Sequence, residues 1–187
     1  MTDIMIDLET LSTRADAAIL SVGIAVFDIK TGKVSDTLYK EVTMEVQKEY
    51  GHIDPATVKW WLQRDQDARQ AICEQAYPEY LYNVLYKVRD FLQNNNIHKS
   101  TSRVWSNGSS FDLVILRHAF QRHYLDLPWG YWQERDCRTI CDLAKDICGI
   151  DVKPSSQDTA HHALQDAINQ AESVSWAYRA LAYTGDE

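Results

Sequence analysis

Four acidic residues stand in segments of the chain that are otherwise apolar. Asp7 and Glu9 lie two residues apart in the strand-like stretch MIDLETLST, where alternation along a strand places both carboxylates on one face. Asp112 opens the apolar stretch after RVWSN, and Asp166 lies among alanines near the C-terminus. Burying an unpaired carboxylate costs on the order of several kcal/mol, so these positions require a compensating partner.

Each acid alone has an ordinary explanation, but the set of four indicates a metal site. Asp112 is suited to stabilise a helix N-terminus, and Asp166 is suited to a solvated helix face. Carboxylates brought together from separate elements need cations, and oxygen ligands without cysteine or paired histidine select Mg²⁺ or Mn²⁺. Two such ions, about 3.5–4 Å apart, clamp the attacking and leaving oxygens in phosphoryl transfer. His161, five residues before Asp166, is a candidate base for an attacking water.

The elements that position these residues follow from periodicity and turn signals. Residues 3–43 alternate like strands around the turn Lys30-Thr31-Gly32 and predict an antiparallel meander. Asp54 and Pro55 predict the N-cap and first position of the next helix. The remaining predictions are a helix over 78–94, a strand in 103–108, a helix from 111 capped by Ser109 or Ser110, a helix over 136–149 closed by Gly149, and a helix over 164–182. Together they predict an α/β fold, a mixed sheet flanked by helices, in one domain spanning residues 1–187.

Composition excludes several classes of protein. The 187 residues are 45% hydrophobic and contain no apolar run of about 18 residues, so we expect no membrane span. The N-terminus lacks the pattern of a secretory signal, and the four cysteines are best explained as reduced thiols, so a cytoplasmic location is expected. A net charge of −8 argues against a protein that simply coats phosphates, but not against an enzyme that meets phosphates through metal ions.

Three motifs resemble those of a known family. The sequences DLET at 7–10, NGSSFD at 107–112 and HHALQDA at 161–167 are similar, in order, to the motifs of DEDDh 3′→5′ exonucleases. These include RNase T, oligoribonuclease and polymerase proofreading subunits. The likeness spans residues 4 to about 180. It is strongest to a compact, stand-alone exoribonuclease branch that also holds phage-type and exonuclease VIII-like nucleases. Three residues separate Asn107 from Phe111, where many members have two.

The resemblance implies a ribonuclease H-like fold and a two-metal exonuclease. It assigns Asp7, Glu9, Asp112 and Asp166 as ligands of two Mg²⁺ or Mn²⁺ ions and His161 as the general base. His162 is out of register with Asp166 by one residue. The implied substrate is the 3′ end of single-stranded nucleic acid, RNA before DNA, and the implied product is a nucleoside 5′-monophosphate. The alternatives are a DNA-directed exonuclease of the same chemistry and a non-catalytic nucleotide-binding module, and the family likeness also suggests a homodimer.

Four further residues are candidates for substrate contact, each with a plainer alternative. Leu11 is placed to wedge against a terminal base or to pack in the core. Phe111, beside Asp112, is equally ambiguous. Asn107 is a turn residue or a hydrogen-bond donor to substrate. Arg138 is a phosphate contact or half of a surface ion pair.

Two adjacent tryptophans raise a similar question. Trp60 and Trp61 point about 100° apart on a helix, so they cannot form one flat surface. Both belong to the core, or one of them, with Trp61 as the candidate, stacks on a nucleobase, because aromatic faces bind single strands without reading sequence.

Overall fold

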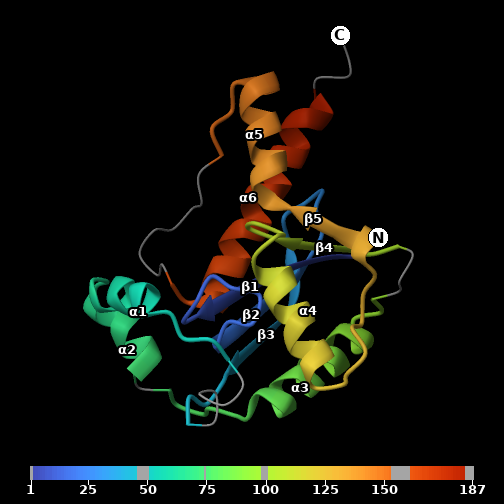
Figure 1. Ribbon diagram of the computed structural model, residues 1–187. Coiled ribbons are helices and arrows are strands. Elements are labelled where there is room, and N and C mark those ends of the chain that lie inside the picture. Colours follow the sequence, from blue (N-terminus) through green and yellow to red (C-terminus); the bar gives the residue numbers. More distant parts are fainter. Residues whose placement is uncertain (1, 46–50, 74, 98–100, 153–160, 184–187) are drawn as a thin grey trace.

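The computed structural model describes residues 2–45, 51–73, 75–97, 101–152 and 161–183, with the side chains of 71–73 left aside. A single five-stranded sheet is flanked by helices on both faces (Figure 1). Its strands are β1 (Asp3–Thr10), β2 (Ile19–Phe27), β3 (Val34–Glu41), β4 (Arg103–Ser106) and β5 (Glu134–Asp136). The helices are α1 (Pro55–Leu62), α2 (Gln66–Cys73), α3 (Leu81–Asn94), α4 (Asp112–Arg122), the short 3-10 helix η2 (Tyr131–Gln133), α5 (Cys137–Cys148) and α6 (Ala163–Tyr183).

The sheet order is β3-β2-β1-β4-β5, with β1 in the middle. The first three strands form the predicted antiparallel meander, and β4 and β5 extend it in parallel with β1. The turn between β2 and β3 closes at Gly32, whose φ of 77° favours glycine. The predicted mixed sheet flanked by helices is therefore confirmed.

Alternation along β1 divides the core into two layers. Ile4, Ile6 and Leu8 belong to the cluster that includes side chains of α3 and α4. Met5 belongs to the second cluster, with α6 residues such as Ala167. Asp3, Asp7 and Glu9 share the parity of Met5, so the three acids of this strand lie on the α6 face.

Several element boundaries differ from the sequence prediction. The helix predicted from residue 78 begins at Leu81, because the backbone of Glu79 stays extended and bonds to Glu41 and Thr43. Neither Ser109 nor Ser110 caps α4. The N-cap is Phe111, without a side-chain bond, because a turn closes there through Phe111 N donating to Gly108 O.

Three short elements have no counterpart in the prediction: α2, η2 and β5. The last consists of three residues, all charged, and lies at the edge of the sheet beside β4. Among the predicted caps, Asp54 is confirmed at the N-terminus of α1, as is Gly149 at the end of α5.

Cys137, Cys141 and Cys148 are free thiols, as expected, whereas the side chain of Cys73 lies outside the described residues. Within the described chain no helix is long and apolar enough to cross a bilayer.

Candidate active site

Asp7 and Glu9 lie at the carboxyl end of β1, beyond the point where β4 stops pairing with it. The register joins Met5 to Trp105, and β4 ends one residue later at Ser106. Ligand sites in such sheets lie outside the carboxyl ends of parallel strands. The two carboxylates therefore lie on the part of β1 that extends past the end of β4.

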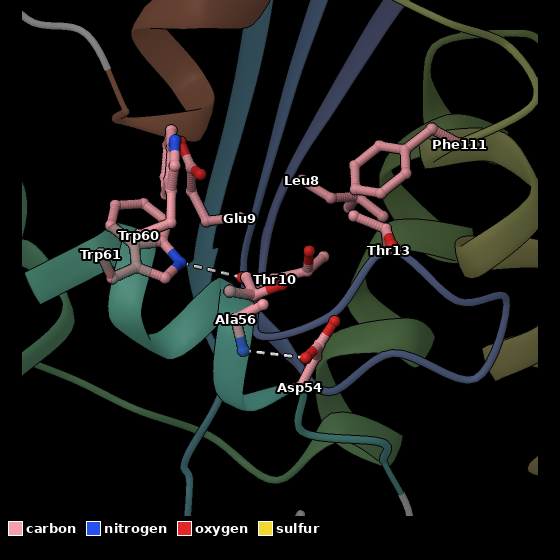
Figure 2. Close-up of a pocket in the computed structure, with 10 residues that line it drawn as sticks. Leu8, Glu9, Thr10, Thr13, Asp54, Ala56, Trp60, Trp61 and Phe111 are labelled. Carbon is pink, nitrogen blue, oxygen red and sulfur yellow. Dashed lines mark hydrogen bonds between the residues drawn. The ribbon is translucent and has the colours of Figure 1, made fainter. Parts of the chain in front are cut away.

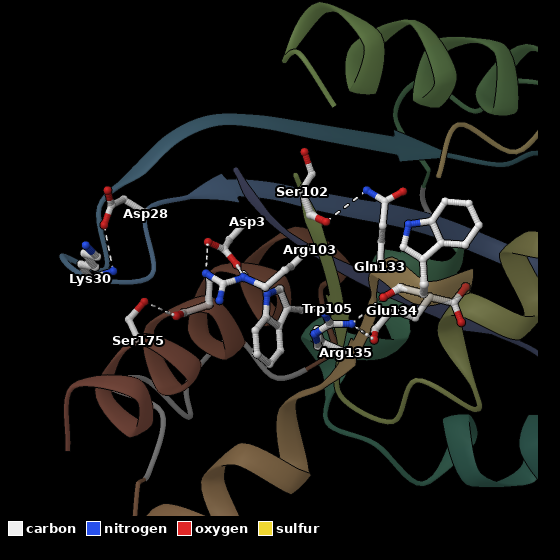
Figure 3. Close-up of polar contacts among 12 residues, drawn as sticks. Asp3, Asp28, Lys30, Ser102, Arg103, Trp105, Gln133, Glu134, Arg135 and Ser175 are labelled. Carbon is white, nitrogen blue, oxygen red and sulfur yellow. Dashed lines mark hydrogen bonds and ion pairs between the residues drawn. The ribbon is translucent and has the colours of Figure 1, made fainter. Parts of the chain in front are cut away.

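A third acid on the same face shows how this fold treats a buried carboxylate that has only a structural role. Asp3 is 1% exposed and accepts two hydrogen bonds from Arg103, at 2.6 and 2.8 Å, and a third from Trp105 Nε1 at 2.8 Å (Figure 3). Its charge is compensated by a guanidinium. Asp7 and Glu9 have no such cation: within the described residues neither forms an ion pair with lysine or arginine.

Asp112 is held against β1 from the other side. As the first residue of α4, it is 3% exposed, and its Oδ1 accepts a hydrogen bond of 3.2 Å from the backbone N–H of Leu8. Leu8 lies between Asp7 and Glu9, so this bond brings the third carboxylate to the same end of the strand.

Asp166 reaches the site because α6 crosses close over β2. Gly23 is paired with Asp7, and a Cβ at Gly23 would lie 2.2 Å from the carbonyl group of Ala163. Only glycine allows the first turn of α6 to approach the sheet this closely. Asp166 lies in that first turn.

The spacing between His161 and Asp166 has a local structural reason. His161 has a φ of 76°, an uncommon value for a residue with a side chain. Its N–H donates a hydrogen bond of 2.9 Å to Asp166 Oδ2, which stabilises this conformation. Ligand atoms of Glu9, His161 and Asp166 all lie within 4.8 Å of one another. His162, in contrast, stacks on Tyr39, with ring centroids 4.3 Å apart.

The four acids are unfavourable in their charged form, because they are buried and lie close to one another. Burial is the largest cause that raises the pKa of each one. The charges of Asp112 and Glu9 further raise the pKa of Asp7, which lies well above its ordinary value. Burial and the charges of Asp166 and Asp112 raise the pKa of Glu9 to about 8.

Asp112 also has partners that favour its charged form. Burial raises its pKa to about 7, although the Leu8 N–H and the charge of Arg138 act in the opposite direction. Bound divalent cations would remove the cost of holding the four carboxylates charged together. The oxygen donors suit Mg²⁺ or Mn²⁺, so the residues present fit the metal site that the sequence predicts.

A pocket of about 440 Å³ opens beside Glu9 (Figure 2). Trp60 and Trp61 lie on one side of it and Leu8 and Phe111 on the other. The exposed area of the lining is mostly apolar, and the pocket size is within the range of small-molecule sites.

The two tryptophans have different environments. Trp61 is 4% exposed, packs in the cluster of Leu11, Ala18 and Leu20, and donates from Nε1 to the carbonyl of Thr10 at 2.9 Å. Trp60 is 39% exposed. A core role for both residues is therefore wrong, because the helix turns only one of them inward. Trp61, the candidate for base stacking, has the core role, although its edge lines the pocket.

The remaining substrate candidates fall into two groups. Leu11 is 6% exposed, so core packing accounts for it. Asn107 lies in the bend after β4, so a role as a turn residue accounts for it. Phe111 lines the pocket, and Arg138 is exposed over Gly108 without an ion pair among the described residues. The surface ion pair considered for Arg138 is thus not formed.

Two residues that the sequence analysis did not single out also shape the site. Gln170, one turn after Asp166 on α6, donates from Nε2 to Asp7 Oδ1 at 2.7 Å. Gly23 provides the close approach of α6 described above. The four-residue spacing from Asp166 could have indicated that Gln170 shares its helix face. Nothing in the sequence alone marks Gly23.

Comparison with known proteins agrees with this geometry. The family model described as the 3′-5′ exoribonuclease Rv2179c-like domain matches residues 2–178. An exodeoxyribonuclease of Enterobacteria phage T4 is 24% identical over 204 residues, covering 96% of this chain and 90% of that protein.

Solved structures show the same fold at low identity. The nuclease domain of 3′hExo, a DEDDh family member bound to rAMP, has a TM-score of 0.61 at 14% identity, covering 95% of this chain and 92% of that one. Cell-death related nuclease 4 has a TM-score of 0.67 at 14% identity and covers 95% and 64%. The zinc-bound complex of E. coli exonuclease I with single-stranded DNA has a TM-score of 0.69 at 15% identity and covers 97% and 42%. The chain thus spans less than half of exonuclease I.

The family match defines the class of protein as a 3′→5′ exonuclease, with a fold shared by the DEDDh family member 3′hExo. Within that class, the chain belongs to the family of 3′-5′ exoribonuclease Rv2179c-like domains.

Proposed function

We propose that the chain removes nucleotides one at a time from the 3′ end of single-stranded nucleic acid, with RNA as the preferred substrate. The observation that carries the proposal is the convergence of Asp7, Glu9, Asp112 and Asp166 at one end of β1 without a compensating lysine or arginine ion pair among the described residues. The family description, an exoribonuclease, supports RNA.

The four carboxylates would hold two Mg²⁺ or Mn²⁺ ions. When bound, such ions stabilise the negative charge that develops on the phosphate during displacement. The protein's own contribution is to hold the carboxylates in place, through the Leu8 N–H on Asp112 and the Gln170 amide on Asp7. Preorganised ligands of this kind are typically required for a functional metal site.

His161 is the proposed general base. It would take a proton from the attacking water, whose oxygen bonds to phosphorus while the bond from phosphorus to the 3′ oxygen of the preceding nucleotide breaks. The products would be a nucleoside 5′-monophosphate and a strand one residue shorter with a new 3′ hydroxyl. The ring of Trp60 lies edge-on to His161, with centroids 4.8 Å apart, and limits where the imidazole can move.

The pocket beside Glu9 is the proposed site for the last nucleoside. Its aromatic walls suit a base, and its position next to the acids suits a nucleoside whose phosphate lies among them. A pocket that receives the last nucleoside beside the acids would also suit removal of nucleotides from a chain end.

A second candidate is a DNA-directed exonuclease of the same chemistry, which the name of the phage T4 relative favours. A non-catalytic nucleotide-binding module is disfavoured, because all five proposed site residues are present. A homodimer remains a prediction, which light scattering on the purified protein tests.

The test uses RNA and DNA single strands of one sequence, labelled at either end, incubated with Mn²⁺ and resolved on a denaturing gel. The expected result is a ladder from the 5′-labelled strand, immediate mononucleotide from the 3′-labelled strand, and faster loss of RNA. A 3′-phosphate should slow degradation and a circular strand should survive. Cleavage of circles would show an endonuclease and overturn the proposal.

A further inference from the structure

We propose that Asp54 reads the edge of the 3′-terminal base and makes the enzyme favour a terminal guanine over uracil or thymine. This inference rests on the proposed function, because it assumes that the pocket beside Glu9 holds the last nucleoside. It goes further by assigning a base preference and the residue that sets it.

Among the described residues that line the pocket, Asp54 provides the one carboxylate besides Glu9. The rest of its lining is apolar or aromatic, apart from the hydroxyls of Thr10, Thr13 and Thr57. Glu9 and Asp54 lie apart in the pocket, with Thr10 and Ala56 between them in the view of Figure 2. A base between the aromatic walls would therefore present its edge to very few polar groups.

Asp54 is held rigidly. Its backbone N–H donates to Leu11 O at 2.8 Å, just beyond β1, and its carbonyl accepts from Val58 N at 3.0 Å. Its Oδ1 accepts from Ala56 N at 2.9 Å, which makes it the N-cap of α1. A carboxylate whose backbone is held by two bonds and whose own oxygen accepts a third is preorganised to select among ligands.

The second oxygen of this carboxylate is available to a ligand. Among the described residues nothing donates to Oδ2 of Asp54, and Figure 2 shows it pointing away from Ala56, toward the side of the pocket where Thr13 lies. The cap therefore occupies one oxygen and leaves the other as an acceptor at the pocket wall.

Charge separates the base end of the pocket from the phosphate end. The acid cluster that includes Glu9 would hold cations, and such cations would attract the phosphate. A carboxylate at the position of Asp54 repels phosphate oxygens and attracts hydrogen-bond donors. The nucleoside thus has one orientation, with its phosphate toward Glu9 and its base toward Asp54.

The donors on each base then determine the preference. Enzymes that take a base into a pocket read its Watson–Crick edge by hydrogen bonds while aromatic groups stack on its faces. Adenine and cytosine offer an amino group, and guanine offers an amino group beside an imino N–H, whereas uracil and thymine have carbonyl oxygens on both sides of their imino group. An acceptor such as Asp54 Oδ2 favours guanine and disfavours uracil and thymine.

The experiment compares kcat/KM for four single strands that differ only in the 3′-terminal base, made as RNA and as DNA. The wild-type protein is expected to remove guanine about ten-fold faster than uracil, as one good hydrogen-bonded pair allows. In Asp54→Asn, the side-chain carbonyl keeps the bond to Ala56 N, because asparagine is as good an N-cap as aspartate. Its NH₂ group then replaces Oδ2, so a donor replaces an acceptor and the preference should shift toward uracil.

Asp65→Asn is the matched control. Asp65 also caps a helix, accepting from Ala68 N at 2.9 Å, but it does not line the pocket. Asp65→Asn should keep the wild-type base preference, and both variants should melt close to the wild-type temperature.

The outcomes separate the two claims. Failure of the wild-type protein to degrade any 3′ end with Mn²⁺ would overturn the proposed function. Degradation without a base preference, or with one that Asp54→Asn leaves unchanged, would overturn only the role of Asp54. A change in the RNA-to-DNA ratio with unchanged base preference would also overturn it, since the carboxylate would then contact the ribose.

Discussion

The side-chain amide of Gln170 donates a hydrogen bond of 2.7 Å to Asp7 Oδ1, joining the last helix to the first strand. This bond lowers the pKa of Asp7 against burial and the neighbouring acids, which raise it. It also fixes which way the carboxylate faces. Gln170 is thus a positioning residue for Asp7, and the metal site depends on how α6 docks on β1.

We predict that Gln170→Ala weakens metal binding without unfolding the protein. Groups that orient a metal ligand typically contribute about 10–100-fold in metal affinity or activity. The Mn²⁺ concentration for half-maximal activity should therefore rise by about ten-fold or more in a metal titration. Gln165→Ala is the control, because Gln165 lies on the same helix and bonds to Asn169 instead of an acid. Equal behaviour of the two variants would contradict the role of Gln170.

Gly23→Ala should lose activity although no group of the site is removed. A Cβ at Gly23 would lie 2.2 Å from the backbone of Ala163, so the first turn of α6 must move away from the sheet. That turn carries Asp166. We expect a lower melting temperature and a loss of turnover of about 10²-fold, as misplacement of reacting groups by about 1 Å can cause. Gly149→Ala is the control, since its Cβ would meet nothing within 4 Å, although its φ of 69° costs some stability. Near-wild-type turnover in Gly23→Ala would contradict this account of α6 docking.

Metal-free protein should become less stable as the pH rises. Unfolded carboxyl groups titrate near pH 4, whereas in the folded protein the pKa of Glu9 is about 8 and that of Asp112 about 7, chiefly through burial. Between these values the folded state binds more protons than the unfolded state. The free energy of unfolding therefore falls as the pH rises from about 4.5 to about 8, and the contribution of these groups is level above that.

The measurement is the melting temperature with EDTA and with millimolar Mn²⁺. We expect the EDTA value to fall by roughly 3 °C or more between pH 6 and pH 8.5. The rise caused by Mn²⁺ should be larger at pH 8.5, because protons compete with the metal for the carboxylates. Asp7→Asn should raise the melting temperature in EDTA and largely abolish the response to Mn²⁺. A melting temperature that does not change with Mn²⁺ at either pH value would contradict the proposed metal site.

The sequence was sufficient to predict the central features of this architecture, because they depend on local patterns. Strand alternation placed Asp7 and Glu9 on one face, and the turn at Gly32 and the cap at Asp54 carry their own signals. The roles of Gln170 and Gly23 depend instead on contacts between elements more than a hundred residues apart. No periodicity encodes such a contact, so these residues became visible only in the structure.

The two tryptophans show the same limit and provide a further prediction. Helical geometry separates Trp60 from Trp61 by about 100°, but only the packed structure shows which one is buried.

Trp61→Ala should destabilise the protein by about 3–5 kcal/mol, as expected for a buried aromatic side chain. Trp60→Ala should leave the denaturation midpoint nearly unchanged and raise KM for single strands, because base stacking contributes about 1–3 kcal/mol. Urea titration measures the loss of stability, and steady-state kinetics measures the change in KM. If Trp60→Ala lowered stability and left KM unchanged, Trp60 would not contact the substrate.

His161 and His162 distinguish catalysis from metal binding. His161 lies with Glu9 and Asp166, whereas His162 stacks on Tyr39. Loss of a general base typically costs about 10²–10⁴-fold in rate, so His161→Ala should lose most turnover and still show the rise in melting temperature with Mn²⁺. If the rise disappears as well, His161 is a metal ligand and not only a base. His162→Ala should keep turnover within a few-fold, since its ring stacks on Tyr39 and is not part of the group formed by Glu9, His161 and Asp166. Loss of activity in His162→Ala alone would mean that the spacing to Asp166 has been assigned to the wrong histidine, and full activity in both variants would refute the proposed mechanism.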